Sequence, residues 1–116
     1  MIAVIFEVWP REDQREAYLA AAASLRDQLQ QVDGLVSIER FESLSQPGKM
    51  LSLSIWRDEQ AVQQWRTMAE HRQAQQAGRQ GLFHDYRLRV AAVMRDYGLH
   101  DRAQAPEDSQ QAHGGR

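Results

Sequence analysis

The chain has 116 residues, of which 42% are hydrophobic, and its formal net charge is −2. A chain of this size can bury one compact core, but it has no room for a cofactor domain beside a substrate domain. It contains no cysteine, which excludes disulfides, thiolate metal sites, iron–sulfur clusters and a cysteine nucleophile. Basic residues are interleaved with acidic ones and form no stripe, so nucleic acid is not an expected partner.

Two features of the ends bear on location and domain limits. Residues 1–7 lack the basic leader and small-residue cleavage site of a signal peptide, and no apolar run reaches the length of a membrane span, so we expect a cytoplasmic protein without membrane contact. After Gly98 the sequence turns polar and cannot bury enough surface to offset its ordering entropy. We therefore predict one domain over residues 1–97 and a mobile tail over 98–116.

The first half of the chain predicts a strand and then a helix. Residues 2–8 are almost all apolar and rich in β-branched side chains, which is typical of a strand covered on both faces. From residue 11 the apolar positions follow spacings of three and four, as on one stripe of a helix: Tyr18, Ala22, Leu25, Leu29 and Val32. Gly34 is placed to end this helix in the left-handed conformation.

The second half predicts a hairpin, a crossover and a last strand. Residues 35–41 and 50–56 are strand-like, and Pro47 and Gly48 between them suit a type II turn. Asp58 is a suitable N-cap for a crossover in two helical parts, the second of which ends at Gly78. Residues 82–93 alternate as a strand, with Phe83 and Tyr86 on opposite faces.

This order is β-α-β-β-(α-α)-β, an α+β arrangement of the ferredoxin-like kind with a four-stranded antiparallel sheet. Helices on only one face of the sheet leave the other face to be covered, and a 2-fold homodimer covers it sheet against sheet. Apolar side chains on both strand faces favour that dimer.

Several of these segments together resemble one family. The Asp33-Gly34-Leu35 turn, residues 51–56, the Asp58-Glu59 and Ala61-Val62 pairs and Trp65 are similar to the antibiotic biosynthesis monooxygenase (ABM) family over roughly residues 1–97. The resemblance implies a dimeric α/β barrel with a pocket between sheet and crossover in each subunit. It also implies a monooxygenase that oxidises a small aromatic or enolic substrate with O₂ and needs no cofactor and no metal.

The expected catalytic residues lie on the crossover. His71 can take a proton from a phenol, and Trp65 faces the same side only if the helix is kinked or restarts between them. Arg79 and Arg72 can stabilise a phenolate or a reduced oxygen species by charge-assisted hydrogen bonds. The plainer alternatives are that Trp65 belongs to the core, His71 covers a helix, and both arginines solvate a helix face.

The expected substrate-binding residues besides Arg72 are mostly aromatic. Phe6, Met68 and Phe83 suit the wall of an apolar cavity, and Tyr86 can bond a substrate hydroxyl or carbonyl. The alternatives are ordinary core packing for the first three and a cross-strand or dimer-interface pair for Tyr86.

A second functional hypothesis is a non-catalytic dimer that binds a small hydrophobic ligand such as haem. Haem cleavage within the resembled family calls for an asparagine on the first strand, and this chain contains no asparagine. An isomerase or decarboxylase on the same fold is a third hypothesis, which oxygen uptake distinguishes from the first.

Overall fold

A computed structural model describes the backbone of residues 1–77 and 81–113, and the side chains of residues 1–68 and 81–110. The elements are, in chain order, β1 (Ile2–Pro10), a 3₁₀ turn (Glu12–Gln14), α1 (Arg15–Leu29), β2 (Leu35–Glu42), β3 (Met50–Trp56), α2 (Glu59–Ala77), β4 (Phe83–Ala92) and α3 (Glu107–His113). None of the described helices is long and apolar enough to cross a membrane.

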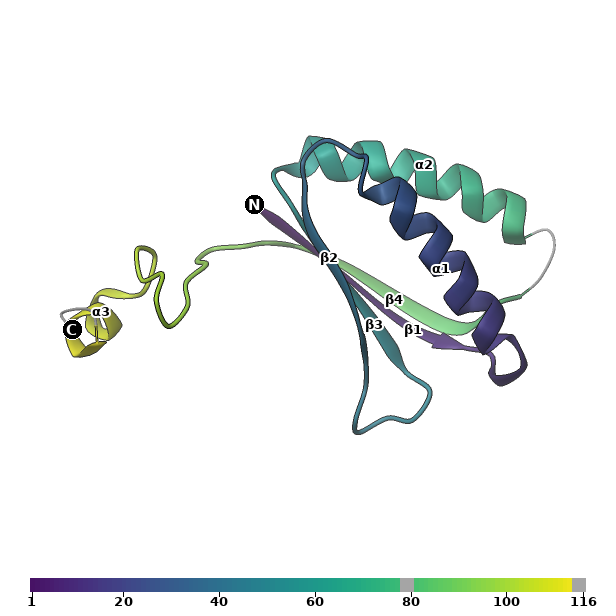
Figure 1. The fold of residues 1–116 in the computed structure, drawn as a ribbon, viewed down its shortest axis with the longest axis horizontal. Coiled ribbons are helices and arrows are strands. Elements are labelled where there is room, and N and C mark those ends of the chain that lie inside the picture. Colours follow the sequence, from purple (N-terminus) through teal and green to yellow (C-terminus); the bar gives the residue numbers. More distant parts are fainter. Residues whose placement is uncertain (78–80, 114–116) are drawn as a thin grey trace.

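The four strands form one sheet in the order β2-β3-β1-β4, and all neighbours are antiparallel. Helices α1 and α2 lie on the same face of this sheet, and the other face carries no helix (Figure 1). The predicted ferredoxin-like α+β fold is confirmed. The helix-covered face is called the inner face below, and the other the open face.

Two short local signals set the connections. Gly34 has the predicted left-handed conformation, with φ +95°, but it does not end the helix: α1 stops at Leu29, and Gly34 forms the turn into β2 instead. A Cβ atom at Gly34 would lie 2.6 Å from Cβ of Ala61. In the β2–β3 hairpin, Gly48 has φ +84° and the Lys49 N–H donates to the carbonyl of Gln46 over 3.2 Å. The main chain at Gly34 thus packs directly against the first turn of α2.

The crossover is one helix rather than the two parts expected from the sequence. Asp58 caps it, since the Ala61 N–H donates to Asp58 Oδ1 over 2.9 Å. No glycine or proline occurs between residues 59 and 77, so nothing interrupts the backbone hydrogen bonds of α2. Trp65 and His71 were expected to face the same side only if the helix is kinked between them. The backbone of α2 shows no such kink.

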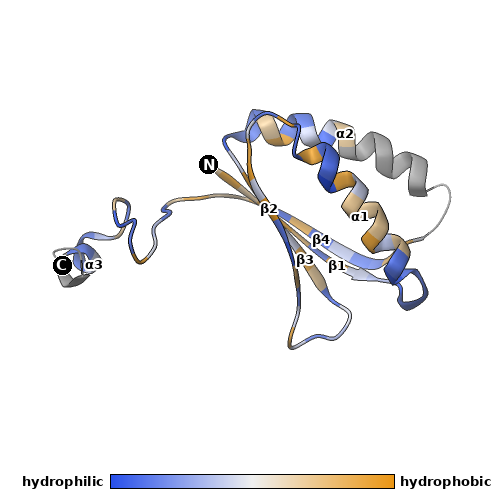
Figure 2. Ribbon diagram, viewed as in Figure 1, coloured by the Kyte–Doolittle hydropathy of each residue, from blue (hydrophilic) through white to orange (hydrophobic). Residues whose placement is uncertain are grey.

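The core between sheet and helices consists of two separate groups of buried side chains. One contains Val4, Leu29, Trp56, Ala61 and Val62, and the other contains Val8, Tyr18 and Met50. The amphipathic pattern of α1 is visible along its length in Figure 2, and its predicted stripe faces the sheet. Residues of both groups border the cavity described below.

The predicted alternation of the last strand fails at its start. The β1–β4 register shifts between Trp9 and Pro10, so Phe83 and Tyr86 come to the same face, with ring centroids 6.1 Å apart. A strict period of two had placed them on opposite faces. Only the pairing with β1 reveals the irregularity.

The open face is apolar at its centre, with Ile5, Phe41, Leu51, Leu53 and Ile55. A charged group lies beside them: Glu7 pairs with Lys49 and with Arg89, each over 3.0 Å. Its hydrogen bond from Lys49 and the two positive charges lower the pKa of the Glu7 carboxyl against a smaller effect of burial.

Residues beyond β4 run away from the sheet (Figure 1). They include α3, which follows Pro106 and begins with two acidic residues. Proline and acidic residues are common at the start of a helix, although the polar composition of this segment predicted no helix. Arg102 donates to Ser109, and its guanidinium lies 5.3 Å from the centroid of the Tyr97 ring. The segment has local structure where none was expected.

Candidate active site

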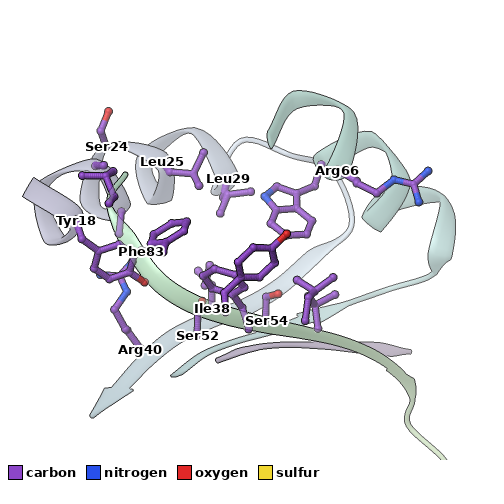
Figure 3. Close-up of a pocket in the computed structure, with 18 residues that line it drawn as sticks. Tyr18, Ser24, Leu25, Leu29, Ile38, Arg40, Ser52, Ser54, Arg66 and Phe83 are labelled. Atoms are coloured by element: carbon purple, nitrogen blue, oxygen red, sulfur yellow. The ribbon is translucent and has the colours of Figure 1, made fainter. Parts of the chain in front are cut away.

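A cavity of about 290 Å³ lies between the inner face of the sheet and the two long helices (Figure 3). Strands alternate their side chains, so the residues that reach it from the sheet are every second one of β1, β2 and β3. Most of its wall is apolar: Val4, Phe6, Ala21, Ala22, Leu25, Leu29, Ile38, Leu82, Phe83 and Leu88. The volume is close to the lower end of the range for small-molecule sites, roughly 300–1,000 Å³.

One wall of the cavity is aromatic. The ring centroids of Phe6 and Phe83 lie 6.1 Å apart, those of Tyr18 and Phe83 5.6 Å, and those of Phe6 and Tyr86 5.6 Å. Such edge and tilted contacts leave ring faces and edges for a flat guest. Tyr86 is 57% exposed and stands at the rim, so a ligand that enters past it meets aromatic surface first.

Arg40 and Tyr18 lie beside each other at one end of the cavity (Figure 3). Burial raises the pKa of the Tyr18 phenol, and the charge and hydrogen bond of Arg40 oppose that shift only in part. The phenol therefore keeps its proton at neutral pH. Arg40 Nε is buried without a hydrogen-bond partner.

Two serines of β3 contribute to the floor of the cavity. Ser54 is buried, and its Oγ accepts a hydrogen bond from Nε1 of Trp56 over 2.8 Å. Its own O–H is left to donate elsewhere. Ser52 stands one pleat along the same face, directly opposite Arg40 in the β2–β3 register.

Trp65 borders the cavity from α2. Its ring lies 5.7 Å from that of Trp56, centroid to centroid, and its Nε1 is buried without a hydrogen-bond partner. A buried donor left unpaired costs about 1–3 kcal/mol. An oxygen atom of a bound ligand would remove that cost.

Among the side chains that the structure describes, the cavity wall includes no carboxylate and no histidine. Its polar groups are hydroxyls, the indole N–H and two guanidiniums, of which Arg66 extends away from the other labelled side chains in Figure 3. Within the same described part of the chain, no cluster of three or more histidine, aspartate and glutamate side chains could hold a metal ion. The arrangement suits a mostly apolar guest that carries hydrogen-bond acceptors.

Sequence comparison assigns the family. Residues 1–77 match the family described as "Antibiotic biosynthesis monooxygenase", abbreviated ABM. The chain belongs to this family. The resemblance stated from the turn at Gly34, the third strand and Trp65 is thereby confirmed.

Relatives of this ABM protein include one that is close in sequence. A protein of Pyricularia oryzae named "Jasmonate monooxygenase ABM" is 50% identical over 93 residues, which cover 80% of this chain and 43% of the relative. The chain thus spans less than half the length of that relative.

Solved structures show the same fold at low identity. Rv0793 from Mycobacterium tuberculosis superposes with a TM-score of 0.72 at 23% identity, over 84% of this chain and 98% of the other. SnoaB from Streptomyces nogalater, described as a cofactor-independent oxygenase, gives a TM-score of 0.66 at 11% identity, over 82% and 94% of the two chains.

The structure brings together several of the side chains expected at the site of this ABM protein. Trp65, Phe6, Phe83 and Tyr86 all border the cavity. Met68 is 42% exposed and is not part of the wall. The side chains of His71 and Arg72, and all of Arg79, lie outside the described residues.

Sequence reasoning missed Arg40 and the polar role of Tyr18. Arg40 looked like one of many surface arginines, and Tyr18 like a core residue of the first helix. One signal was available: Arg40 takes the place of an inward residue two positions after Ile38 on a strand, where an apolar side chain is usual. Tyr18 lies on α1, and its position beside Arg40 results from the packing of α1 on the sheet.

Proposed function

We propose that this ABM protein is a monooxygenase that oxidises a small aromatic or enolic substrate with O₂, without a metal or organic cofactor. The observation that carries the proposal is the 50% identity to a named monooxygenase over 93 residues, which cover 80% of this chain. The cavity supports it, since its volume, aromatic wall and unpaired donors suit a flat guest with oxygen substituents.

The proposed reaction needs no outside reductant. An activated CH₂ of the substrate loses a proton, and the resulting anion transfers one electron to O₂. The two radicals combine into a hydroperoxide, which loses water and leaves a carbonyl. One oxygen atom ends in the substrate and the other in water, and the substrate supplies all the electrons. The protein then needs only a base, a dry cavity and donors for the developing oxyanion.

The described residues support particular roles. Trp65 Nε1–H lacks a partner and is suited to hold the oxygen on which the substrate charge develops. Phe6 and Phe83 hold the ring, and Tyr86 borders the entrance and can bond a substrate oxygen. His71 as base, Arg79 and Arg72 as further donors and Met68 as an apolar contact remain predictions.

The proposal includes a homodimer formed through the open face. Five apolar side chains at the centre of that face, Ile5, Phe41, Leu51, Leu53 and Ile55, support it, since no element of the described chain covers them. Residues 1–97 would form the catalytic domain and 98–116 a tail outside it. A cytoplasmic location and the lack of nucleic-acid partners also remain predictions from composition.

A non-catalytic dimer that binds a small hydrophobic ligand such as haem is the alternative. The described wall residues favour it, because none of them offers a histidine or carboxylate as a base to the ligand. The volume of about 290 Å³ argues against haem, which is a larger guest. A titration with hemin that shifts its Soret band at micromolar protein would support this alternative.

Oxygen consumption tests the proposal. Purified protein is mixed under ¹⁸O₂ with an anthrone, which carries such an activated CH₂, and uptake and product mass are followed. Jasmonate is assayed separately with and without NADPH, because hydroxylation of a saturated carbon consumes two electrons that the substrate does not provide. Catalytic uptake with one ¹⁸O atom in the product supports a monooxygenase. Tight binding without uptake for every substrate would favour the binding protein, and uptake-free turnover would favour an isomerase or decarboxylase.

A further inference from the structure

Arg40 is a cation on the wall of an apolar cavity, and no described carboxylate pairs with it. The carboxylate of Glu42, two residues along β2, pairs with Arg15 over 2.9 Å. Glu7 pairs with Lys49 and Arg89 on the opposite face of the sheet. Arg40 Nε is buried without any hydrogen-bond partner. The residue as a whole is half-buried, and a charge on an apolar wall is normally paired, so this guanidinium is suited to an anion that comes from outside the chain.

The groups around Arg40 are donors. Tyr18 is buried beside it and keeps its phenolic proton at neutral pH, as described above. Ser52 stands directly opposite Arg40 across the β2–β3 pair and also borders the cavity. A guanidinium edge, a phenol and a hydroxyl on one end of the cavity match the oxygen atoms of a carboxylate.

We propose that Arg40 and Tyr18 form a carboxylate subsite, so that the substrate is an amphipathic acid held by its carboxylate at this end of the cavity. The apolar and aromatic wall holds the rest of the molecule, and Trp65 bonds a second oxygen near the reacting carbon. This inference rests on the proposed function only in that the substrate occupies the same cavity. Arg40 is the guanidinium at this end of the cavity, whereas Arg66 extends away from the other labelled side chains (Figure 3); the single positive charge here matches a single negative charge, which favours a carboxylate over a phosphate dianion.

The subsite implies an unusual balance between stability and binding. Arg40 is half-buried and has no carboxylate partner among the described residues, so its charge adds little to the stability of the empty protein, and its removal should leave that stability nearly unchanged. If Arg40 served only the fold, its removal would lower the free energy of unfolding. Stability and affinity therefore separate a binding role from a structural one.

Calorimetric titration with jasmonic acid and its methyl ester tests the subsite, since the ester lacks the negative charge of the carboxylate and adds only a methyl group. We expect the wild-type protein to bind the acid about 10- to 100-fold more tightly than the ester, as for a charge-assisted bidentate pair. Arg40→Gln should remove this preference and leave the ester affinity nearly unchanged. Arg40→Lys should keep part of the preference, and Tyr18→Phe should reduce it.

Arg26→Gln is the matched control, because Arg26 is an exposed α1 residue that does not border the cavity. It removes the same charge and should keep the full preference. Equal affinities of the wild type for acid and ester, no binding of the acid at millimolar concentration, or an equal loss for both probes in Arg40→Gln would overturn the subsite. If Arg40→Gln fails to fold, the subsite is overturned as well unless Arg40→Lys and Tyr18→Phe show the graded loss. A preference for the acid without oxygen uptake would support the subsite and contradict the proposed monooxygenase activity. Oxygen uptake without a preference for the acid would support the activity and contradict the subsite.

Discussion

The indole rings of Trp56 and Trp65 lie 5.7 Å apart, centroid to centroid, yet only that of Trp56 has a hydrogen-bond partner for its N–H. Trp56 is fully buried and donates to Ser54, whereas Nε1 of Trp65 is buried, unpaired and next to the cavity. The same residue type therefore has a satisfied donor in the core in one position and an unsatisfied donor beside the cavity in the other.

Substitution of each tryptophan by phenylalanine should separate these roles. Trp56→Phe leaves a cavity and an unpaired Ser54, so we expect a loss of about 2–4 kcal/mol in the free energy of unfolding. Trp65→Phe also removes an unpaired donor, so its loss should be about 1 kcal/mol or less, while turnover falls about 10- to 100-fold. Urea unfolding and oxygen uptake measure the two effects. A Trp65→Phe protein with wild-type turnover would remove Trp65 from the site.

The two glycines with positive φ should respond differently to alanine. Gly48→Ala meets no atom within 4 Å, so only the backbone conformation is strained, at about 1–2 kcal/mol. Gly34→Ala adds the same strain and a contact of 2.6 Å with Ala61 Cβ. We expect a total loss of about 3 kcal/mol or more, because overpacking adds about 1–3 kcal/mol. Equal unfolding free energies for both variants would mean that α2 moves freely away from Gly34.

The N-cap of α2 should make stability depend on pH. The backbone hydrogen bond from Ala61, and then the hydrogen bond from Arg57, lower the pKa of Asp58 from its ordinary value of 3.8. A folded pKa below the unfolded one means that the carboxylate stabilises the fold above pH 3.8, and that this contribution is lost as pH falls through the lower folded value.

Asp58→Asn tests that pH dependence, since asparagine keeps a capping oxygen but does not titrate. In urea unfolding, the wild type should be the more stable protein at pH 7, and the difference should shrink below pH 3.8. A difference that is constant from neutral to acidic pH would show that the charge of Asp58 does not contribute.

The open face should hold two subunits together. Leu53 lies at the centre of that face, opposite Ile5 in the sheet register. Leu53→Lys would place a charge among apolar side chains, and we expect the protein to sediment as a monomer. Leu44→Lys is the control, because Leu44 is fully exposed in the hairpin loop and should not change the mass. A wild-type protein that is monomeric at micromolar concentration would refute the dimer.

The base predicted from the sequence needs a kinetic test. His71→Ala should lower the rate of oxygen uptake about 100-fold or more if His71 takes the substrate proton. His100→Ala, in the exposed segment after β4, should have no effect. If His71→Ala turns over as fast as the wild type, the assignment fails, and a substrate that enters already ionised becomes the better explanation.

Local patterns in the sequence were sufficient for the element order, the turn at Gly34, the hairpin turn at Pro47 and Gly48 and the cap at Asp58. Each depends on a few neighbouring residues, through the period of a strand or helix or through the dihedral angles that one residue type permits. Phe6 and Phe83 were predicted for the cavity wall in the same way, because large apolar side chains on strands point into the core. The sequence also indicates that α2 is one continuous helix, because it contains no glycine or proline between residues 59 and 77.

Only the tertiary structure decided which polar groups meet at the cavity. Arg40 and Tyr18 come from a strand and a helix far apart in the chain, and their proximity follows from how α1 packs on the sheet. The shared face of Phe83 and Tyr86 follows from a register shift against β1, which no period within β4 reveals. Whether a buried donor is satisfied depends on every neighbour at once, so the contrast between Trp56 and Trp65 becomes visible only after the chain has packed.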